Sequence, residues 1–268
     1  MRAVVVIPAY QEAAALRGVV ARTLVHCRDV VVVDDGSTDG TARTVSDLPI
    51  TLLTHARNQG KAQSLWDGFE AALAHGADVI FTLDADGQHT PDDIPRLAAV
   101  VQRHPHSIVL GARLRQRSAA PLLRRAANAL ADFGVAWAGG QAVIDSQSGQ
   151  RAYPVALLRA LMDDGALAHD PRAGFTLETE LLVAAARRGW RIIAVPIDTV
   201  YARDARPSHF RPLRDTVRIS RMLLRHVAAN GRALRALWRA CSAAPTIEVE
   251  GPPQGAGSTM PAASEPRS

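Results

Sequence analysis

The stretch Val79-Ile80-Phe81-Thr82-Leu83-Asp84-Ala85-Asp86-Gly87-Gln88-His89 joins an apolar run to a polar end. Its β-branched and aromatic residues are typical of a buried strand in a parallel sheet. Asp84, Asp86 and Gln88 alternate with Ala85 and Gly87, so in an extended chain their side chains point to one side. Such oxygen ligands suit Mg²⁺ or Mn²⁺, which bind one or two carboxylates together with substrate phosphates. The stretch therefore predicts a divalent-metal site at the end of a strand.

Two other interpretations of this stretch have to be weighed. An EF-hand loop fits poorly, because it requires Gly at its sixth position and Glu at its twelfth, where the chain has His89 and Pro95. A solvated strand end, whose acids bind no ligand, is the remaining alternative.

The 268 residues are enough for one large α/β domain or two small ones, and the 47% hydrophobic content allows a substantial core. The formal net charge is +5, and Lys61 is the only lysine. Cys27 and Cys241 are isolated, which suggests a reducing compartment without a disulfide framework. The apolar run 3–7 is too short for a signal peptide, and no apolar stretch reaches the roughly 18 residues of a membrane-spanning helix. We therefore expect a cytoplasmic protein, with peripheral contact to the inner face of the plasma membrane as an option.

The first 110 residues alternate strand and helix patterns. Ligands of sheets built from such alternation bind at the carboxyl ends of the strands. The pattern predicts an α/β fold with a mostly parallel, doubly wound sheet. The predicted strands are 3–7, 29–33, 50–54, 78–83 and 107–111, and the predicted helices are 12–24, 41–47, 62–75 and 91–103. Polar clusters follow four of these strands, at residues 8–12, 34–37, 58–61 and 84–86.

The second half of the chain is less regular. Helices are predicted at 122–136, at 177–188 and from 212 to about 238, the last with a break at Asn230-Gly231. Residues 144–153 are expected to be extended and 190–195 to form a strand. The Pro, Gly, Ser and Ala content after Ser242 predicts a disordered tail.

Six motifs follow one another along the chain: Ile7-Pro8-Ala9-Tyr10-Gln11-Glu12, Val33-Asp34-Asp35-Gly36-Ser37-Thr38-Asp39-Gly40-Thr41, Asp84-Ala85-Asp86-Gly87-Gln88-His89, Gly111-Ala112-Arg113, Asp145-Ser146-Gln147-Ser148-Gly149 and Ser208-His209-Phe210-Arg211-Pro212. In this order they resemble those of the family 2 glycosyltransferases of the GT-A fold, most of all the dolichyl-phosphate mannose synthase and polyprenyl-phosphate glycosyltransferase branch. The resemblance covers residues 1–225.

The resemblance implies a Rossmann-like, mostly parallel sheet with helices on both faces, followed by C-terminal amphipathic helices. The chain then divides into a catalytic domain (1–211), a basic amphipathic helical segment (212–241) and a disordered tail (242–268). Two residues depart from the family pattern, which usually has Asn at the position of Gln11 and often an aromatic residue at that of Gln150. The C-terminal transmembrane helices of many lipid-phosphate relatives are not expected here.

The resemblance also implies a nucleotide-sugar donor, linked to UDP or GDP, and Mg²⁺ or Mn²⁺ as cofactor. Asp86 and Gln88 are the first-choice metal ligands and Asp84 the third, and the ion would neutralise the leaving diphosphate. Asp34 or Asp35 would accept the ring N–H of uracil or guanine, although the same segment is also good turn chemistry.

Further residues are assigned to the donor by the family pattern. Pro8, Tyr10, Glu12 and Ala85 line the nucleotide site, with a helix start as the other interpretation of Glu12. Lys61 either contacts the donor or is a solvated lysine at a helix start.

A polyprenyl phosphate or similar lipid is the implied acceptor. In this branch, arginines placed like Arg113, Arg124 and Arg125 hold the acceptor phosphate, which suits the planar guanidinium fork. Scattered surface arginines are the alternative. The pattern adds Ser148 to the acceptor side, and it places His209 and Arg211 on a loop over the donor diphosphate. The predicted catalytic residues are Asp86, Arg113, His209 and Arg211.

A hydroxyl acceptor would require a general base, whereas a phosphate already carries its nucleophilic oxygen. Asp145, Glu178 and Glu180 are the candidate bases. Glu178 and Glu180 also fit the first turn of a helix, where negative charge is favourable.

Arginines recur at spacings of three, four and seven between residues 214 and 239, along one side of a helix. Leu224, Leu234 and Trp238 supply apolar area nearby. A basic amphipathic helix is typical of attachment to an anionic membrane surface, and a solvated helix in an arginine-rich chain is the alternative. No recognition motif or aromatic interleaving supports nucleic acid as a partner.

Together these features predict a metal-dependent, inverting glycosyltransferase that moves a hexose from a nucleotide sugar to a polyprenyl phosphate. Transfer to a hydroxyl of a soluble or lipid acceptor is one alternative. A non-catalytic sugar-nucleotide-binding protein is another, and the complete set of Asp84, Asp86 and Gln88 argues against it.

Overall fold

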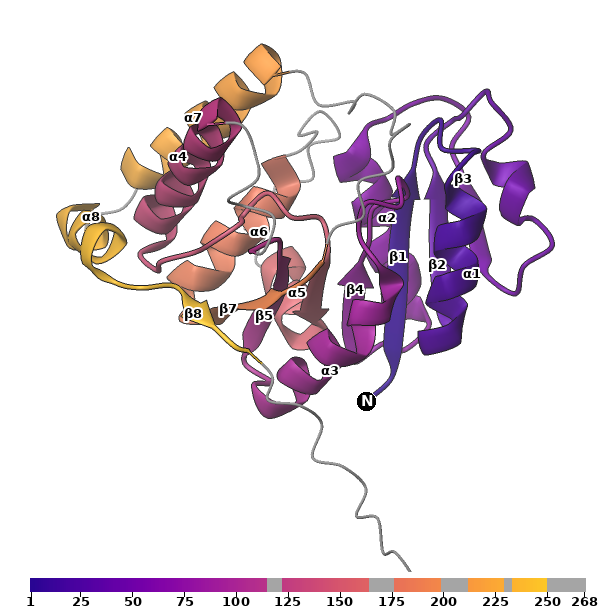
Figure 1. The fold of residues 1–268 in the computed structure, drawn as a ribbon, viewed down its shortest axis with the longest axis horizontal. Helices are drawn as coiled ribbons and strands as arrows, with labels where there is room; N and C mark the ends of the chain where they lie inside the picture. The colour runs from indigo at the N-terminus through magenta and orange to yellow at the C-terminus, as the bar shows by residue number, and fades with distance from the viewer. Residues whose placement is uncertain (115–121, 164–175, 199–211, 229–232, 250–268) are drawn as a thin grey trace, which may run out of the picture.

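The computed structural model describes residues 1–114, 122–163, 176–198, 212–228 and 233–249 (Figure 1). Its strands are β1 (Ala3–Ala9), β2 (Asp29–Asp34), β3 (Thr51–Thr54), β4 (Val79–Thr82), β5 (Ser107–Ala112), β6 (Arg151–Pro154), β7 (Arg191–Pro196) and β8 (Thr246–Ile247). Its helices are α1 (Leu16–His26), α2 (Lys61–Ala74), α3 (Ile94–Arg103), α4 (Leu122–Gly139), α5 (Val155–Asp163), α6 (Thr176–Arg187), α7 (Pro212–Ala228) and α8 (Ala233–Ser242), with short 3₁₀ turns η1 (Ala42–Val45) and η2 (Pro91–Asp93).

The strands form one sheet in the order β3-β2-β1-β4-β6-β5-β7-β8. Neighbouring strands are parallel except for β6, which runs antiparallel to both β4 and β5. The predicted α/β fold with a mostly parallel sheet is therefore confirmed. Because the parallel strands share one direction, their carboxyl ends lie along the same edge of the sheet.

Helices cover both faces of this sheet (Figure 1). Alternate residues of β1 show why: Val4 and Val6 belong to the core that contains α2, α5 and α6, whereas Val5 and Ile7 belong to the core with α1 and α3. Strands buried on both faces need apolar residues at every position, which explains the continuous Val and Ile runs of the sequence.

The three helices α4, α7 and α8 lie side by side at one end of the molecule (Figure 1). Met222 and Leu223 of α7 and Ala236 of α8 are buried, and the Trp137 indole of α4 donates to the Ala233 carbonyl at 3.1 Å. The predicted basic helical segment is thus packed against the rest of the chain through these buried residues, whereas Leu224, Leu234 and Trp238 are exposed. No helix within the described ranges is long and apolar enough to cross a membrane.

Some local predictions differ from the structure. The predicted helix 41–47 is only the 3₁₀ turn η1, the predicted helix 12–24 begins at Leu16, and α5 was not predicted. The chain from 144 to 150 turns instead of running extended, because Asp132 accepts the backbone N–H groups of Asp145 and Ser146.

The strand β8 lies within the tail predicted to be disordered. It pairs with β7 at the edge of the sheet. Just after it, Glu248 forms ion pairs with Arg103 at 2.6 Å and His104 at 2.9 Å. Composition does not indicate this pairing, so β8 and Glu248 are structured where the sequence predicted disorder.

Two helix glycines provide a matched test of the packing. A Cβ at Gly68 of α2 would lie 2.3 Å from Val6 Cγ1, whereas a Cβ at Gly18 of α1 would meet nothing within 4 Å. Gly68→Ala should therefore lower the free energy of unfolding by about 1–3 kcal/mol through overpacking. Gly18→Ala should raise it by about 0.5–1 kcal/mol, because Gly loses more backbone entropy in a helix. Urea denaturation of both variants checks this, and equal effects of the two substitutions would contradict the close packing of α2 on β1.

Candidate active site

The predicted polar residues gather along one edge of the sheet. The parallel strands β1, β2, β4 and β5 end at Ala9, Asp34, Thr82 and Ala112. Each is followed within two residues by a polar side chain, namely Tyr10, Asp35, Asp84 and Arg113. The edge where ligands of parallel sheets bind is therefore rich in charged and polar groups.

Asp84, Asp86 and Gln88 do not lie on an extended strand, so the predicted one-sided alternation is wrong. β4 ends at Thr82, and the Gln88 N–H donates to Asp86 Oδ1 at 2.9 Å. Gly87 has a φ of 72°, a conformation that glycine adopts without strain. The three side chains share a short turn, not one face of a strand.

A half-buried ammonium group lies next to this turn. Lys61 Nζ, at the start of α2, is 2.7 Å from Asp84 Oδ1 and 2.9 Å from Glu178 Oε2 of α6. Burial alone would lower the pKa of Lys61, but the two carboxylates outweigh it and raise this pKa above its ordinary value. Burial likewise opposes ionisation of Asp84, but the charge and hydrogen bond of Lys61 and the positive charges of His89 and Arg151 together outweigh it, so the pKa of Asp84 is lowered. Lys61 is therefore not the solvated helix-start lysine of the alternative interpretation.

Gly149 is required where it packs on Asp84. A Cβ at this position would lie 2.0 Å from Asp84 Oδ2. The Gly149 carbonyl accepts a hydrogen bond from Thr82 Oγ1 at 2.9 Å. The loop before β6 is thus held directly against the carboxylate that pairs with Lys61.

Arg151 is a fully buried cation behind the same group of residues. Its guanidinium donates to the carbonyls of Ser146, Ser148 and Glu178, at 2.8, 2.7 and 2.5 Å. It also lies 3.9 Å from Glu178 Oε1. Arg151 therefore ties the loop before β6 to the first turn of α6.

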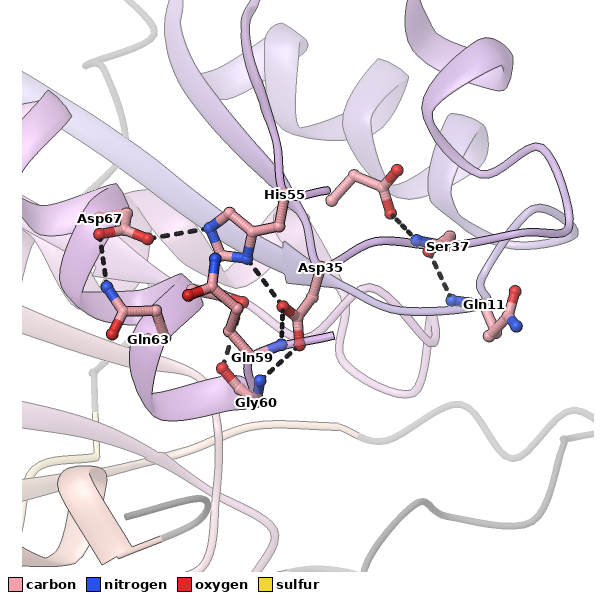
Figure 2. A network of polar contacts seen from close by, with 10 residues as sticks. Gln11, Asp35, Ser37, His55, Gln59, Gly60, Gln63 and Asp67 are labelled. Carbon is pink, nitrogen blue, oxygen red and sulfur yellow. Dashed lines mark hydrogen bonds and ion pairs between the residues drawn. The ribbon is translucent and has the colours of Figure 1, made fainter. Parts of the chain in front are cut away.

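The adjacent acids Asp34 and Asp35 are both buried but have different partners. Among the described residues, the one hydrogen bond of Asp34 Oδ1 comes from the Ser37 N–H at 3.2 Å, which is the turn interaction that the sequence allows. The Asp35 carboxylate accepts three donors at 2.7 Å each, from His55 Nδ1 and the backbone N–H groups of Gln59 and Gly60 (Figure 2). Asp35 thus serves as an anchor for the segment that leads into α2.

The contacts of Gln11 give a reason for glutamine at a position where the family usually has asparagine. Its φ is 59°, a left-handed conformation that Asn adopts more readily than Gln. The longer side chain compensates by accepting the N–H groups of Thr38 and Asp39, both at 3.1 Å. Its own N–H donates to Ser37 Oγ at 2.9 Å (Figure 2). Gln11 therefore joins the end of β1 to the loop after β2.

The neighbours of Gln11 lie at the same edge. Pro8, Tyr10 and Glu12 are each half-buried. The Glu12 carbonyl accepts the N–H of Leu16, the first residue of α1. This agrees with the helix-start interpretation of Glu12 and leaves its side chain at the edge of the sheet.

Arg113 forms an ion pair with Asp145. Its Nε and backbone N donate to Asp145 Oδ2 at 2.9 and 2.8 Å, and its Nη2 donates to Oδ1 at 2.6 Å. Asp145 adopts a φ of 54°. This two-oxygen geometry fixes the guanidinium at the end of β5.

The remaining predicted residues are partly described. Ala85 and Ser148 are buried, and Arg125 is exposed on α4. The side chain of Arg124 lies outside the described part of the structure, as do His209 and Arg211. The structure therefore places the predicted donor-site residues and Arg113 along the same edge of the sheet. The roles of His209 and Arg211 stay predictions.

The Asp84–Gln88 turn was tested for its fit to a metal ion. Among the described residues, no cluster of three or more His, Cys, Asp or Glu side chains is arranged around a common point. Desolvation, followed by the negative charge of Asp84, raises the pKa of Asp86. A divalent cation would relieve this repulsion, and two carboxylates with an amide are the donors that Mg²⁺ and Mn²⁺ accept. The residues present therefore fit such an ion.

Arg151 and His55 were not among the predicted site residues, and Gly149 was named only as part of a motif. His55 could have been found, because it directly follows β3 at the edge where the other polar residues were predicted. Nothing in the sequence indicates that Arg151 is buried, because a lone arginine in a basic chain is ordinarily exposed.

The ion pairs of Lys61 predict a stability effect. Lys61→Met should lower the free energy of unfolding by about 3 kcal/mol, because it leaves two carboxylates without their cation. Urea denaturation measures this, and the double variant Lys61→Met/Glu178→Gln should regain part of the loss. A loss below about 0.5 kcal/mol, as for a surface salt bridge, would contradict the buried arrangement.

Comparison with known proteins agrees with this geometry. Residues 4–156, more than half of the chain, match the family model described as Glycosyl transferase family 2. An undecaprenyl-phosphate mannosyltransferase of Micrococcus luteus is 31% identical over 218 residues, which cover 75% of this chain and 84% of the relative. A UDP-N-acetylglucosamine–dolichyl-phosphate N-acetylglucosaminyltransferase of Methanococcus voltae is 30% identical over 217 residues, which cover 73% and 84%.

A similar solved structure is that of glucosyl-3-phosphoglycerate synthase from Mycobacterium tuberculosis, in complex with Mn²⁺, UDP and glucosyl-3-phosphoglycerate. The TM-score is 0.57 at 21% identity, and the match covers 85% of this chain and 79% of the other. This likeness confirms the predicted GT-A fold. The chain belongs to glycosyl transferase family 2 and is a glycosyltransferase.

Proposed function

We propose that this glycosyltransferase carries out a metal-dependent, inverting transfer of a hexose to a polyprenyl phosphate. The acceptor class rests on one observation: two of the three candidate bases are held in ion pairs, Asp145 by Arg113 and Glu178 by Lys61. A hydroxyl acceptor needs a base, whereas a phosphate brings its own charged oxygen. The names of the two relatives, which refer to undecaprenyl phosphate and dolichyl phosphate, support the same class.

On the donor side, Asp86 and Gln88 would hold Mg²⁺ or Mn²⁺, with Asp84 as the third ligand. When bound, the ion supplies positive charge for the leaving diphosphate. Lys61 holds Asp84 ionised and in place at 2.7 Å. In this proposal His209 and Arg211 cover the diphosphate.

The nucleotide base is assigned to Asp34. The Asp35 carboxylate is occupied by three donors, whereas Asp34 has one weak backbone contact, at 3.2 Å, within the part of the chain that the structure describes. A uracil or a guanine presents a ring N–H to such an acceptor, so the proposal includes UDP-linked and GDP-linked donors. The residues Pro8, Tyr10, Glu12 and Ala85 border this donor site.

On the acceptor side, Arg113 is the central residue. Asp145 orients its guanidinium at the end of β5, and a planar fork held in this way binds phosphate oxygens with little further loss of freedom. The exposed Arg125 and its neighbour Arg124 lie on α4. The buried Ser148 hydroxyl, which has no hydrogen-bond partner in the described structure, completes this side.

The helices α7 and α8 are proposed to rest on an anionic membrane surface. Trp238 and Leu234 are 70% and 82% exposed, and Leu224 is 60% exposed. The exposed arginines of the same two helices are Arg221, Arg225, Arg235 and Arg239. Exposed apolar side chains between arginines match a lipid headgroup layer, where the phosphate of a polyprenyl acceptor lies.

The donor-side proposal predicts that Asp86→Ala abolishes metal-dependent turnover. Losing a ligand of the ion that stabilises the leaving diphosphate should reduce kcat on the order of 100-fold or more. The assay is release of nucleoside diphosphate from a panel of nucleotide sugars, with membrane extract as acceptor and with or without EDTA. Asp92→Asn, an exposed acid of η2, is the control and should keep its activity. EDTA-resistant, near-normal turnover of Asp86→Ala would refute the metal role.

The membrane proposal is tested by substitution, because Met222 and Leu223 make α7 part of the core. Arg235→Gln/Arg239→Gln should weaken binding to anionic vesicles roughly 30-fold, since each arginine near such a surface contributes about 1 kcal/mol. Co-sedimentation measures this binding, which should also fall with added NaCl.

The matched control for this experiment carries the same loss of charge elsewhere. Arg28→Gln/Arg43→Gln removes two exposed arginines near α1 and η1. It should bind vesicles like the unmodified protein. Equal weakening by both double variants would indicate general charge attraction and would refute a membrane face on α7 and α8.

A further inference from the structure

One buried histidine at the active-site edge has no part in the proposed chemistry. His55 directly follows β3, and its side chain is only 9% exposed. Its Nδ1 lies 2.7 Å from Asp35 Oδ1 and its Nε2 lies 2.9 Å from Asp67 Oδ2 (Figure 2). The ring therefore contacts one carboxylate at each of its two nitrogens. His55 thus bridges the end of β2 and the helix α2.

The bridge is supported from the side of α2. Gln63 Nε2 donates to Asp67 Oδ1 at 2.8 Å, so both oxygens of Asp67 have partners within the network (Figure 2). Both residues lie on α2, one turn apart. The contact of His55 Nε2 with Asp67 therefore fixes the orientation of the imidazole ring that contacts Asp35.

Asp35, which contacts the other ring nitrogen, also binds the backbone just before α2. Its two oxygens accept the N–H groups of Gln59 and Gly60 at 2.7 Å. Gly60 is the residue before α2 and has a φ of 98°, a conformation that glycine adopts without strain. The next residue is Lys61, which pairs with Asp84.

The same anchor fixes the neighbouring turn. A Cβ at Gly36 would lie 2.4 Å from the Arg57 backbone, so the loop after β2 and the loop after β3 are in close contact. Asp34, the proposed acceptor for the nucleotide base, precedes this turn directly. A shift of Asp35 would therefore move Asp34 on one side and Lys61 on the other.

We propose that His55 is a positioning residue of the donor site, which holds Asp35 so that Asp34 and Lys61 keep their places for the nucleotide and the diphosphate. This inference rests on the proposed function, because it assumes that a nucleoside diphosphate binds at this edge. His55 itself is separated from the donor by Asp35 and acts through it.

Three substitutions separate positioning from a general loss of stability. His55→Asn keeps an N–H donor near the position of Nδ1 and loses the contact with Asp67. His55→Gln places its amide farther out, toward Asp67, and His55→Ala removes both contacts. His26→Ala is the matched control, because His26 also contacts an acid, Asp92 at 3.0 Å, but lies at the end of α1.

The measurements are calorimetric titration of UDP and of GDP in the presence of Mn²⁺, donor KM and kcat, and thermal unfolding. His55→Ala and His55→Gln should bind the preferred nucleoside diphosphate about tenfold more weakly, as expected for the loss of one hydrogen bond to a charged group. Donor KM should rise by a similar factor, with a smaller change in kcat. His55→Asn should regain most of the affinity, and His26→Ala should keep all of it.

Unchanged affinity in folded His55→Ala or His55→Gln would overturn the inference. So would a loss of affinity in all three His55 variants that follows their thermal stability, without rescue by Asn. If the unmodified protein binds neither UDP nor GDP, the proposed function itself fails. That outcome is distinct from normal nucleotide binding that is insensitive to His55.

Discussion

A single half-buried ammonium group joins three segments that are far apart in the sequence. Lys61 Nζ lies between Asp84 of the turn after β4 and Glu178 of α6, at 2.7 and 2.9 Å. Two carboxylates at this depth would repel each other strongly without it. Gly149 has no side chain because the Asp84 carboxylate occupies that space, and Arg151 supports Glu178 from behind. The position of the candidate metal-binding turn thus depends on one cation.

Charged side chains on both proposed sides of the active site are held in place by polar or oppositely charged partners. On the proposed donor side, Asp35 and His55 fix the segment that places Lys61, and Asp34 has a single backbone contact among the described residues. On the proposed acceptor side, Asp145 fixes Arg113. Two of the candidate bases, Asp145 and Glu178, are therefore partners of cations. An acceptor that carries its own negative oxygen suits such a site better than one that must lose a proton.

The sequence predicted the sheet, its parallel character and the edge at which polar residues meet, because continuous apolar strands and polar strand ends are local signals. It could not predict that Asp84–Gln88 turns instead of continuing the strand, since Gly87 permits either conformation. The ion pair of Arg113 with Asp145 and the burial of Arg151 could not be predicted from the sequence either. They depend on contacts between residues 27–32 positions apart, for which one sequence carries no pattern. Similarly, β8 is stabilised by Glu248 and its distant partners, not by its own composition.

The central claim is that the acceptor supplies its own charged oxygen. The most direct measurement compares sugar transfer to a polyprenyl phosphate with transfer to the polyprenol of equal chain length, using the same nucleotide sugar and Mn²⁺. If the acceptor supplies the charged oxygen, a glycosylated product should form from the phosphate and none above background from the alcohol. Equal or faster transfer to the alcohol would contradict it, and would mean that one of the carboxylates acts as a base.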